Sequence, residues 1–175
     1  TMEVEKMLDA IAKRASCRSY KPDPVPDEAV DELVKAALSA PSGNNARPWH
    51  IIVVRDAQKR QALSQVHRWA FFCAESPVVL VVCGDEQKSP HWWIEDCAAA
   101  IENVLVQATA LGLGTCWVGI RGSDERGYDR EEAVRKICNI PDHIRVSALI
   151  AVGYPAEQPH PKGPGPMDAV HQETW

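Results

Sequence analysis

The sequence has no apolar run near the roughly 18 residues that a membrane-spanning helix requires, and it has no excess of positive charge. Its 175 residues carry a net charge of −5, with a pI near 5.7. Nucleic acids and anionic membranes both attract proteins with a cationic surface, so we expect neither as a partner. The N-terminal stretch "TMEVEKMLDAIAKR" lacks the apolar segment of a signal peptide, which predicts a cytoplasmic location.

Several motifs that define binding sites are also missing. No Cys-x-x-Cys or His-x₃₋₅-His pair is present, so the chain lacks the ligand spacings that zinc and iron–sulfur sites commonly use. We therefore predict no metal site. No G-x-G-x-x-G or G-x-x-x-x-G-K-[ST] motif occurs, so a dinucleotide would have to bind without its usual fold. No convincing Ser-His-Asp or Cys-His pairing appears either. Six cysteines are predicted to be reduced thiols, most of them within buried apolar stretches: Cys17, Cys73, Cys83, Cys97, Cys116 and Cys138.

Apolar spacing predicts an alternation of helices and strands. The first helix should turn Val4, Met7, Leu8 and Ile11 toward a core. The unbroken apolar run 49–54 predicts a central strand with both faces covered. Helices are expected over about 4–12, 27–38, 56–67, 91–111 and 129–140, and strands over 49–54, 77–84, 115–120 and 146–154.

This order predicts an α/β (α+β) sandwich in which helices flank a mixed or antiparallel sheet, built as one domain over residues 1–175. The helix at 91–111 is the longest, and its expected buried stripe is Ile94, Cys97, Ala98, Ile101, Leu105, Ala108 and Leu111. Residues 155–175 contain five prolines, which favour an extended tail over a helix or a central strand.

Three polar stretches interrupt this apolar framework. The stretch "KRASCRSYK" at 13–21 contains guanidinium and hydroxyl groups that can donate hydrogen bonds to a phosphate, although a solvated basic loop has the same composition. "PSGNN" at 41–45 offers hydrogen-bonding groups in a loop that Pro41 and Pro48 restrain, and a plain tight turn would look alike. "GLGTCWVG" at 112–119 is a glycine-rich turn that could simply end a helix.

Taken together, these stretches resemble the nitroreductase family of flavoproteins over nearly the whole chain. "RASCRSY" is similar to that family's R-R-S-x-R element, and "APSGNNARPWHIIVV" to its A-P-S-x-x-N-x-Q-P-W-x-F-x-V element. "IEDCAAAIENVLVQATALGLGTCWVG" resembles its central helix and following turn, and "GYP" with a late Lys162 resembles its end.

The resemblance implies FMN at the interface of an intertwined homodimer whose tail 155–175 packs on the partner subunit. Arg14, Ala15 and Ser16 would lie at the phosphate and ribityl chain, and Arg18 would lie at the N1 and O2 side of the ring. Pro41, Ser42, Gly43 and Asn45 would come from the partner, and Thr115, Cys116 and Trp117 would lie near ring N5 and O4. Lys162 would add a phosphate contact.

Two positions depart from the family pattern. Pro164 stands where the family's late K-x-R motif has a phosphate-binding arginine, so Lys162 acts alone unless Arg121 or another basic group substitutes. Arg47 stands where the family has glutamine, which adds a charge beside the expected site.

The resemblance therefore predicts an FMN-dependent oxidoreductase that takes a hydride from NAD(P)H and passes it to a small acceptor, such as a nitroaromatic or a quinone, in a ping-pong cycle. No protein acid–base pair is needed, because the flavin carries that chemistry. Three alternatives stay open: a flavin carrier with little turnover, a dehalogenating or flavin-modifying member of the family, and a dimeric module without cofactor.

Overall fold

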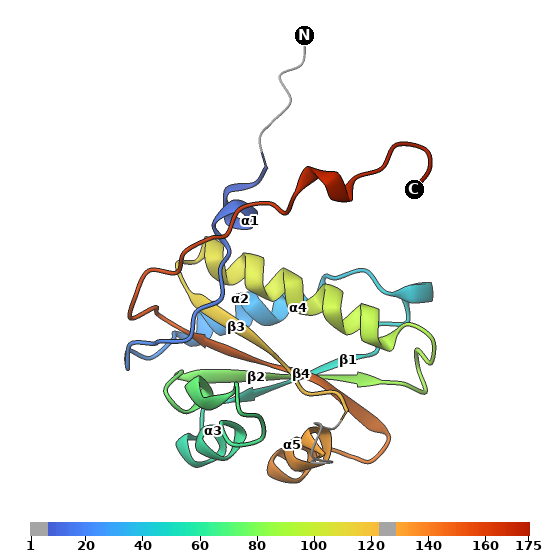
Figure 1. The fold of residues 1–175 in the computed structure, drawn as a ribbon. Helices are drawn as coiled ribbons and strands as arrows, with labels where there is room; N and C mark the ends of the chain where they lie inside the picture. The colour runs from blue at the N-terminus through green and yellow to red at the C-terminus, as the bar shows by residue number, and fades with distance from the viewer. Residues whose placement is uncertain (1–6, 123–128) are drawn as a thin grey trace.

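A computed structural model describes residues 7–122 and 129–175 of the chain. Within these residues, four strands form one antiparallel sheet in the order β1-β2-β4-β3 (Figure 1). The two central strands, β2 and β4, are almost entirely buried. The predicted sandwich of helices around a sheet is thus confirmed, with every pairing between these strands antiparallel. The strands are β1 (Trp49–Val54), β2 (Val78–Asp85), β3 (Gly114–Gly119) and β4 (Ile144–Gly153).

β1 lies at an edge of the sheet, so the prediction of a central strand at 49–54 is wrong. It pairs with β2 along its whole length, while His50 and Val53 are exposed. β-branched residues favour any strand in which they fit a pleated, half-buried surface, and they do not specify a central place. An apolar run therefore indicates a strand but leaves its neighbours undetermined.

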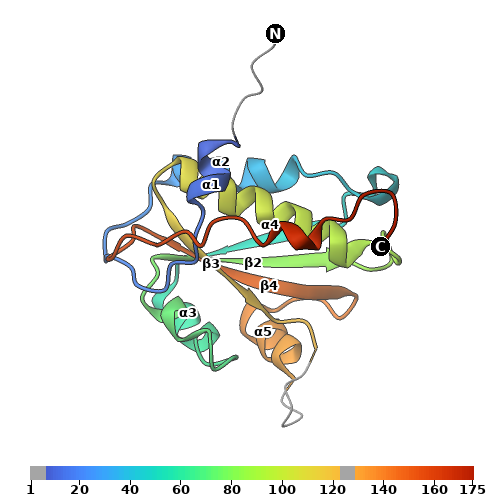
Figure 2. The same ribbon diagram turned by 45° about the horizontal axis from the view of Figure 1, so that its top comes forward.

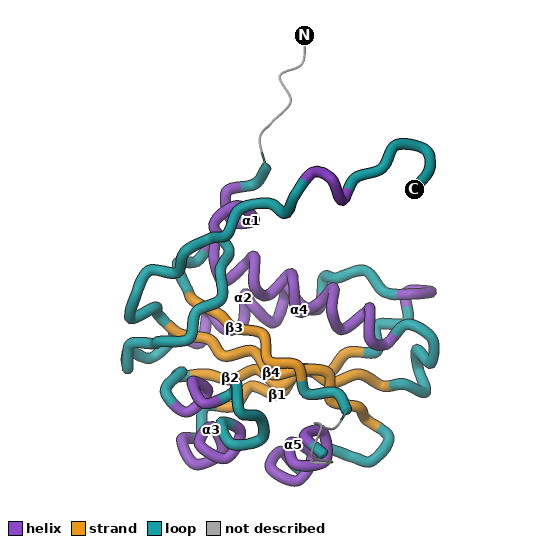
Figure 3. The backbone as a smooth tube through the Cα atoms, viewed as in Figure 1, coloured by secondary structure: helices purple, strands orange, loops and turns teal. Residues whose placement is uncertain are grey.

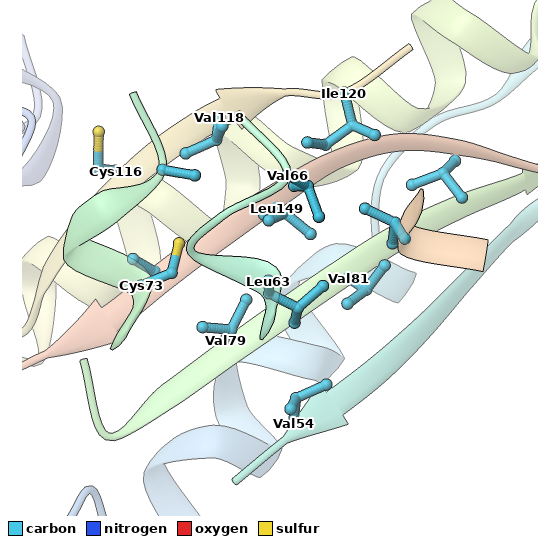
Figure 4. Packing of buried hydrophobic residues seen from close by; sticks show 14 of the residues in the cluster. Val54, Leu63, Val66, Cys73, Val79, Val81, Cys116, Val118, Ile120 and Leu149 are labelled. Atoms are coloured by element: carbon cyan, nitrogen blue, oxygen red, sulfur yellow. The ribbon is translucent and has the colours of Figure 1, made fainter. Parts of the chain in front are cut away.

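Helices cover both faces of the sheet (Figures 1 and 2). α2 (Asp27–Leu38) and α4 (Trp93–Ala110) lie on one face, and α3 (Ala57–Leu63) and α5 (Arg130–Cys138) lie on the other. Alternate β2 side chains serve the two layers: Val78, Leu80 and Val82 pack toward α2 and α4, whereas Val79, Val81 and Cys83 pack toward α3 and α5. Figure 4 shows part of the second cluster, including Leu63, Val66, Val79, Val81 and Leu149.

α3 begins as the sequence predicts and ends early. The Asp56 carboxylate accepts a hydrogen bond from the Lys59 N–H at 2.8 Å, which is the usual N-cap arrangement. The helix stops at Leu63 instead of continuing to His67. A turn and the short 3₁₀ helix η2 (Phe71–Ala74) then lead into β2.

α4 is the long helix that the sequence predicts, but its buried face differs at both ends. Ile94 and Leu111 are 38% and 41% exposed, so their place in the predicted stripe is wrong. Cys97, Ile101 and Leu105 are buried as expected. The full buried set is Trp93, Asp96, Cys97, Ala100, Ile101, Val104, Leu105 and Ala108, and it includes one carboxylate.

The first and the last segments that the structure describes lie outside the layers. α1 (Asp9–Lys13) is short, and Met7, Leu8 and Ile11 are exposed, which contradicts the expected core-facing side; Val4 lies outside the described residues. The tail after β4 passes α1 as an extended segment with one short 3₁₀ helix, η3 (Met167–Ala169) (Figures 1 and 3). No helix among the described residues is long and apolar enough to cross a lipid bilayer.

Candidate functional site

One pocket of about 490 Å³ lies between the end of α1 and the tail. Arg14, Ala15, Ser16 and Arg18 line it from the segment after α1, and Lys162 lines it from the tail. Four of these five predicted site residues come from one segment and the fifth comes from the tail, which passes α1 (Figures 1 and 2). A guanidinium, a hydroxyl and an ammonium group in one pocket form a donor set suited to a phosphate.

The tail also supplies a residue that the sequence analysis missed. His160 lines the same pocket, two positions before Lys162, and so does Pro164, the position of the missing arginine. Arg121 is not among the residues that line the pocket. The imidazole of His160 is therefore the additional nitrogen donor that the structure brings to this pocket, which Glu102 of α4 also lines. A histidine within the "HPK" stretch was the available signal.

The segment after α1 is held against β3. Ser16 and Thr115 form a parallel bridge, and the Cys17 N–H donates to the Thr115 carbonyl oxygen at 2.8 Å. Gly114 permits this approach, because a Cβ atom there would lie 2.7 Å from Cys17 Sγ. The glycine-rich turn at 112–119 thus does more than end a helix, although Thr115 itself is buried and lines neither described pocket.

A second pocket of about 590 Å³ adjoins the first, and Arg18 lines both. Its walls are largely aromatic, with Trp69, Phe71 and Trp117. The predicted residue Cys116 also lines it. Burial raises the pKa of the Cys116 thiol, although the nearby Arg18 guanidinium opposes the shift. A thiol held in its neutral form is a poor nucleophile, so this pocket suits binding of a planar ring better than covalent catalysis.

The segment between α3 and β2 is the second contribution that the sequence analysis missed. His67, Trp69 and Phe71 line the second pocket, and the Trp69 N–H donates to His67 Nδ1 at 3.0 Å. Trp69 and Phe71 are 59% and 56% exposed. The signal was the cluster of aromatic residues in "HRWAFF", which lies outside any periodic element.

Four other predicted residues lie elsewhere in the chain. Pro41, Ser42, Gly43 and Asn45 line neither pocket. They belong to the loop around the 3₁₀ helix η1 (Gly43–Asn45), which packs at the beginning of α4, whereas the segment after α1 pairs with β3 beyond the end of α4 (Figures 1 and 2). Within one copy of the chain, the predicted site residues therefore lie in two separate groups.

A buried carboxylate fastens this loop to α4. The Gly43 N–H donates to Asp96 Oδ1 and the Ser89 hydroxyl donates to Asp96 Oδ2, both at 2.8 Å. Asp96 is only 4% exposed and lies in the first turns of α4, where the helix dipole favours a negative charge. Asp96 is not among the residues that the sequence predicts for the site, although its spacing from Trp93 and Ala100 places it on the buried face.

These residues fit the group that the resemblance implies. The first pocket has the donors that a phosphate requires, the second has walls for a flat aromatic ring, and Arg18 is common to both. A model of the nitroreductase family matches the chain over residues 11–71 and 65–154, together most of its length. The chain belongs to the nitroreductase family.

Comparisons with individual proteins agree with this assignment. A protein of Methanothermobacter thermautotrophicus with the provisional name NADH dehydrogenase/NAD(P)H nitroreductase is 37% identical over 99% of this chain and 91% of its own. A crystal structure from Parabacteroides distasonis, under the same provisional name, has a TM-score of 0.91 at 36% identity and covers 95% of this chain and 97% of the other. An FMN-dependent nitroreductase from Clostridium difficile has a TM-score of 0.87 at 33% identity, with coverage of 97% and 100%.

For this nitroreductase-family chain, the predicted family, fold class and oxidoreductase nature are therefore confirmed. The individual roles of the site residues stay predictions. Among the described residues, no group of three or more His, Cys, Asp or Glu side chains is placed to hold a metal ion.

Proposed function

We propose that the chain acts as a homodimeric FMN-dependent oxidoreductase that takes a hydride from NADH or NADPH and reduces a small acceptor such as a nitroaromatic or a quinone. The supporting observation is that Arg18 lines both the pocket with phosphate donors and the pocket with aromatic walls. FMN carries a phosphate and a planar ring in one molecule, and when bound it supplies the hydride chemistry. The names of relatives that include FMN and NAD(P)H agree with this assignment.

The first pocket would hold the phosphate end. Arg14 offers two parallel N–H donors, Ser16 offers a hydroxyl, and Lys162 offers an ammonium group from the tail. Because the chain carries an overall negative charge, a local cluster of this kind is needed to attract a dianionic phosphate. His160 would add a further nitrogen donor where the family's arginine is absent.

The second pocket would hold the ring end. Trp69, Phe71 and Trp117 present flat apolar surfaces that exclude water from one side of a bound ring. Arg18 brings a positive charge to the boundary between the pockets. A guanidinium beside the pyrimidine part of the ring stabilises negative charge there, which would raise the reduction potential of the bound flavin.

A second copy of the chain would complete the site. The loop at 41–45 is fastened to the beginning of α4, away from both pockets, so its polar groups could reach a bound ring only from another subunit. Met7, Leu8 and Ile11 next to the first pocket, and Met167 and Trp175 in the tail, are exposed apolar side chains that a partner would bury.

The test begins with the absorption spectrum of the purified protein, which should show bound flavin or acquire it after FMN is added. NADH or NADPH added anaerobically should then bleach the flavin absorbance without any acceptor. A nitroaromatic or a quinone added afterwards should restore it. Initial-rate plots should be parallel, as a ping-pong exchange through one shared pocket requires.

Other outcomes would point to other functions. A flavin that is bound but reduced by neither nucleotide within minutes would favour a carrier or a different electron donor. Intersecting initial-rate plots would contradict the shared pocket. A colourless protein that ignores added FMN would contradict the proposed function as a whole.

A further inference from the structure

The loop at 42–47 holds three residues other than glycine in the left-handed region of the backbone. Asn44, Asn45 and Arg47 have φ angles of 53°, 52° and 49°. Asparagine adopts this conformation readily because its short amide side chain bonds locally, whereas arginine has no such compensation. Arg47 therefore needs specific contacts to hold it in this conformation.

Those contacts join Arg47 to two of the predicted site residues. Its backbone N–H donates to Ser42 Oγ at 2.9 Å, and its side-chain Nε–H donates to Asn45 Oδ1 at 3.1 Å. A guanidinium group can donate hydrogen bonds but cannot accept them, so the amide atom of Asn45 that faces it must be the oxygen. The orientation of the Asn45 amide, otherwise an ambiguous choice, is thus set by the chemistry of its neighbour.

This orientation determines what the rest of the loop can offer. Because Oδ1 faces Arg47, the exposed side chain of Asn45 presents the two N–H donors of its Nδ2 group. Ser42 Oγ already accepts a hydrogen bond from Arg47, which leaves its hydroxyl proton to donate. Within residues 7–122 and 129–175, no hydrogen bond uses Asn45 Nδ2.

We propose that Arg47 is a positioning residue that sets Asn45 as a hydrogen-bond donor toward a carbonyl oxygen of the flavin held by another copy of the chain. The inference rests on the proposed function, which supplies both the flavin and the second copy. The pyrimidine edge of a flavin carries two carbonyl oxygens, and each accepts such a donor. A loop with its donors already oriented loses little freedom on binding.

The residue type at position 47 matters because the family pattern has glutamine there. A glutamine amide can donate or accept, so it would permit either orientation of Asn45. Arginine permits one orientation and adds a positive charge near the loop. The charge should raise the reduction potential of a bound flavin, and the hydrogen bond should strengthen its binding.

The experiment compares FMN dissociation constants, from quenching of flavin fluorescence, and the midpoint potential of the bound flavin. Asn45→Asp keeps the shape of the side chain and its hydrogen bond to Arg47 but replaces the donor with an oxygen. It should weaken FMN binding by at least about tenfold, the effect of leaving a buried acceptor unpaired beside a charge. Arg47→Ala should weaken binding by about threefold or more and lower the potential, whereas Arg47→Lys should keep the potential near that of the wild type.

Lys88→Ala is the matched control, because it removes a positive charge and the hydrogen bond of Lys88 Nζ to the Arg47 carbonyl oxygen at 3.4 Å, while the hydrogen bond from Arg47 to Asn45 remains. It should change FMN affinity by less than about twofold. Thermal unfolding of each variant reports whether the fold is intact. If Asn45→Asp fails to fold, the affinity and potential of Arg47→Ala decide the question.

The outcomes separate this inference from the proposed function. A wild-type protein that binds FMN, together with folded Asn45→Asp and Arg47→Ala variants that bind it equally well, would overturn the role of Arg47 and leave the proposed function standing. A wild-type protein that binds no FMN would overturn both.

Discussion

Arg14 is half-buried in the first pocket, which Ser16 and Lys162 also line. There its guanidinium group can donate two hydrogen bonds to a dianionic phosphate. We predict that Arg14→Ala weakens FMN binding by about 1.5–3 kcal/mol, the contribution of a charge-assisted hydrogen bond to phosphate. Riboflavin lacks the phosphate, so its affinity should hardly change. Parallel fluorescence titrations with the two flavins check this, and an equal loss for both would show that Arg14 does not contact the phosphate.

His160 offers a separate prediction at the same scale, because it lines the pocket in which Pro164 replaces an arginine. His160→Ala should weaken FMN binding by about threefold to tenfold, since one donor to an anion is lost. Riboflavin lacks the phosphate, so its affinity should hardly change in this variant. Fluorescence titrations with the two flavins check this, and an equal loss for both would show that His160 does not contact the phosphate.

At this scale the structure gathers some of the residues that the resemblance singled out and adds others that it did not. Arg14, Ser16 and Lys162 line one pocket, and their contacts with a phosphate stay predictions. His160 and Trp69 also line the pockets, but they lie in segments whose spacing carries no signal of a contact with a distant residue. Motif spacing records local geometry, whereas these contacts arise from how the tail and the α3–β2 segment fold back.

At the scale of elements, the loop at 41–47 and the beginning of α4 act as one unit through Asp96. Asp96→Ala leaves the Gly43 N–H and the buried Ser89 hydroxyl without their shared acceptor. We predict a loss of about 2–4 kcal/mol in the free energy of unfolding, as expected for two unsatisfied groups, measured by urea denaturation. FMN binding should weaken as well if this loop contributes to the site.

Asp96→Asn is the matched variant, because its oxygen can still accept from Gly43 while its Nδ2 group donates to Ser89 Oγ. It should therefore lose clearly less stability than Asp96→Ala. Equal losses in the two variants would mean that the negative charge at the beginning of α4, and not the pair of hydrogen bonds, holds the loop.

Periodicity predicted the existence and type of the helices and strands, and it predicted their surroundings less well. The bounds of α2 and β1 agree with those predicted from the sequence to within a residue or so. Pro26 and Asp27 mark the beginning of α2, and Pro48 directly precedes β1. The edge position of β1 and the exposed face of α1 were not predictable from spacing. An apolar residue in a regular pattern indicates that its side chain is buried. It does not indicate whether the side chain packs against the same chain or against another subunit.

At the scale of the whole molecule, this ambiguity concerns the tail. The Ala156 N–H donates to the Ser19 carbonyl oxygen at 2.9 Å, and Pro155 bridges to Tyr20, so the tail is held to its own chain as far as residue 156. Beyond that point, no hydrogen bond among the described residues joins the tail to the layers. Such a segment keeps a defined path only where something else packs against it.

The tail therefore leads to a prediction about assembly. Met167, Val170 and Trp175 are 77%, 55% and 101% exposed, and burial on a second subunit would stabilise them by about 1.5–3 kcal/mol each. Replacing all three by serine should raise the dissociation constant of the dimer at least about a hundredfold, measured by analytical ultracentrifugation. His160 and Lys162 remain in this variant, so any loss of FMN affinity would come from losing the second copy's loop. A triple variant that stays dimeric would contradict the role of the tail. A monomeric variant that binds FMN as tightly as the wild type would contradict the shared site, because one chain alone would then suffice.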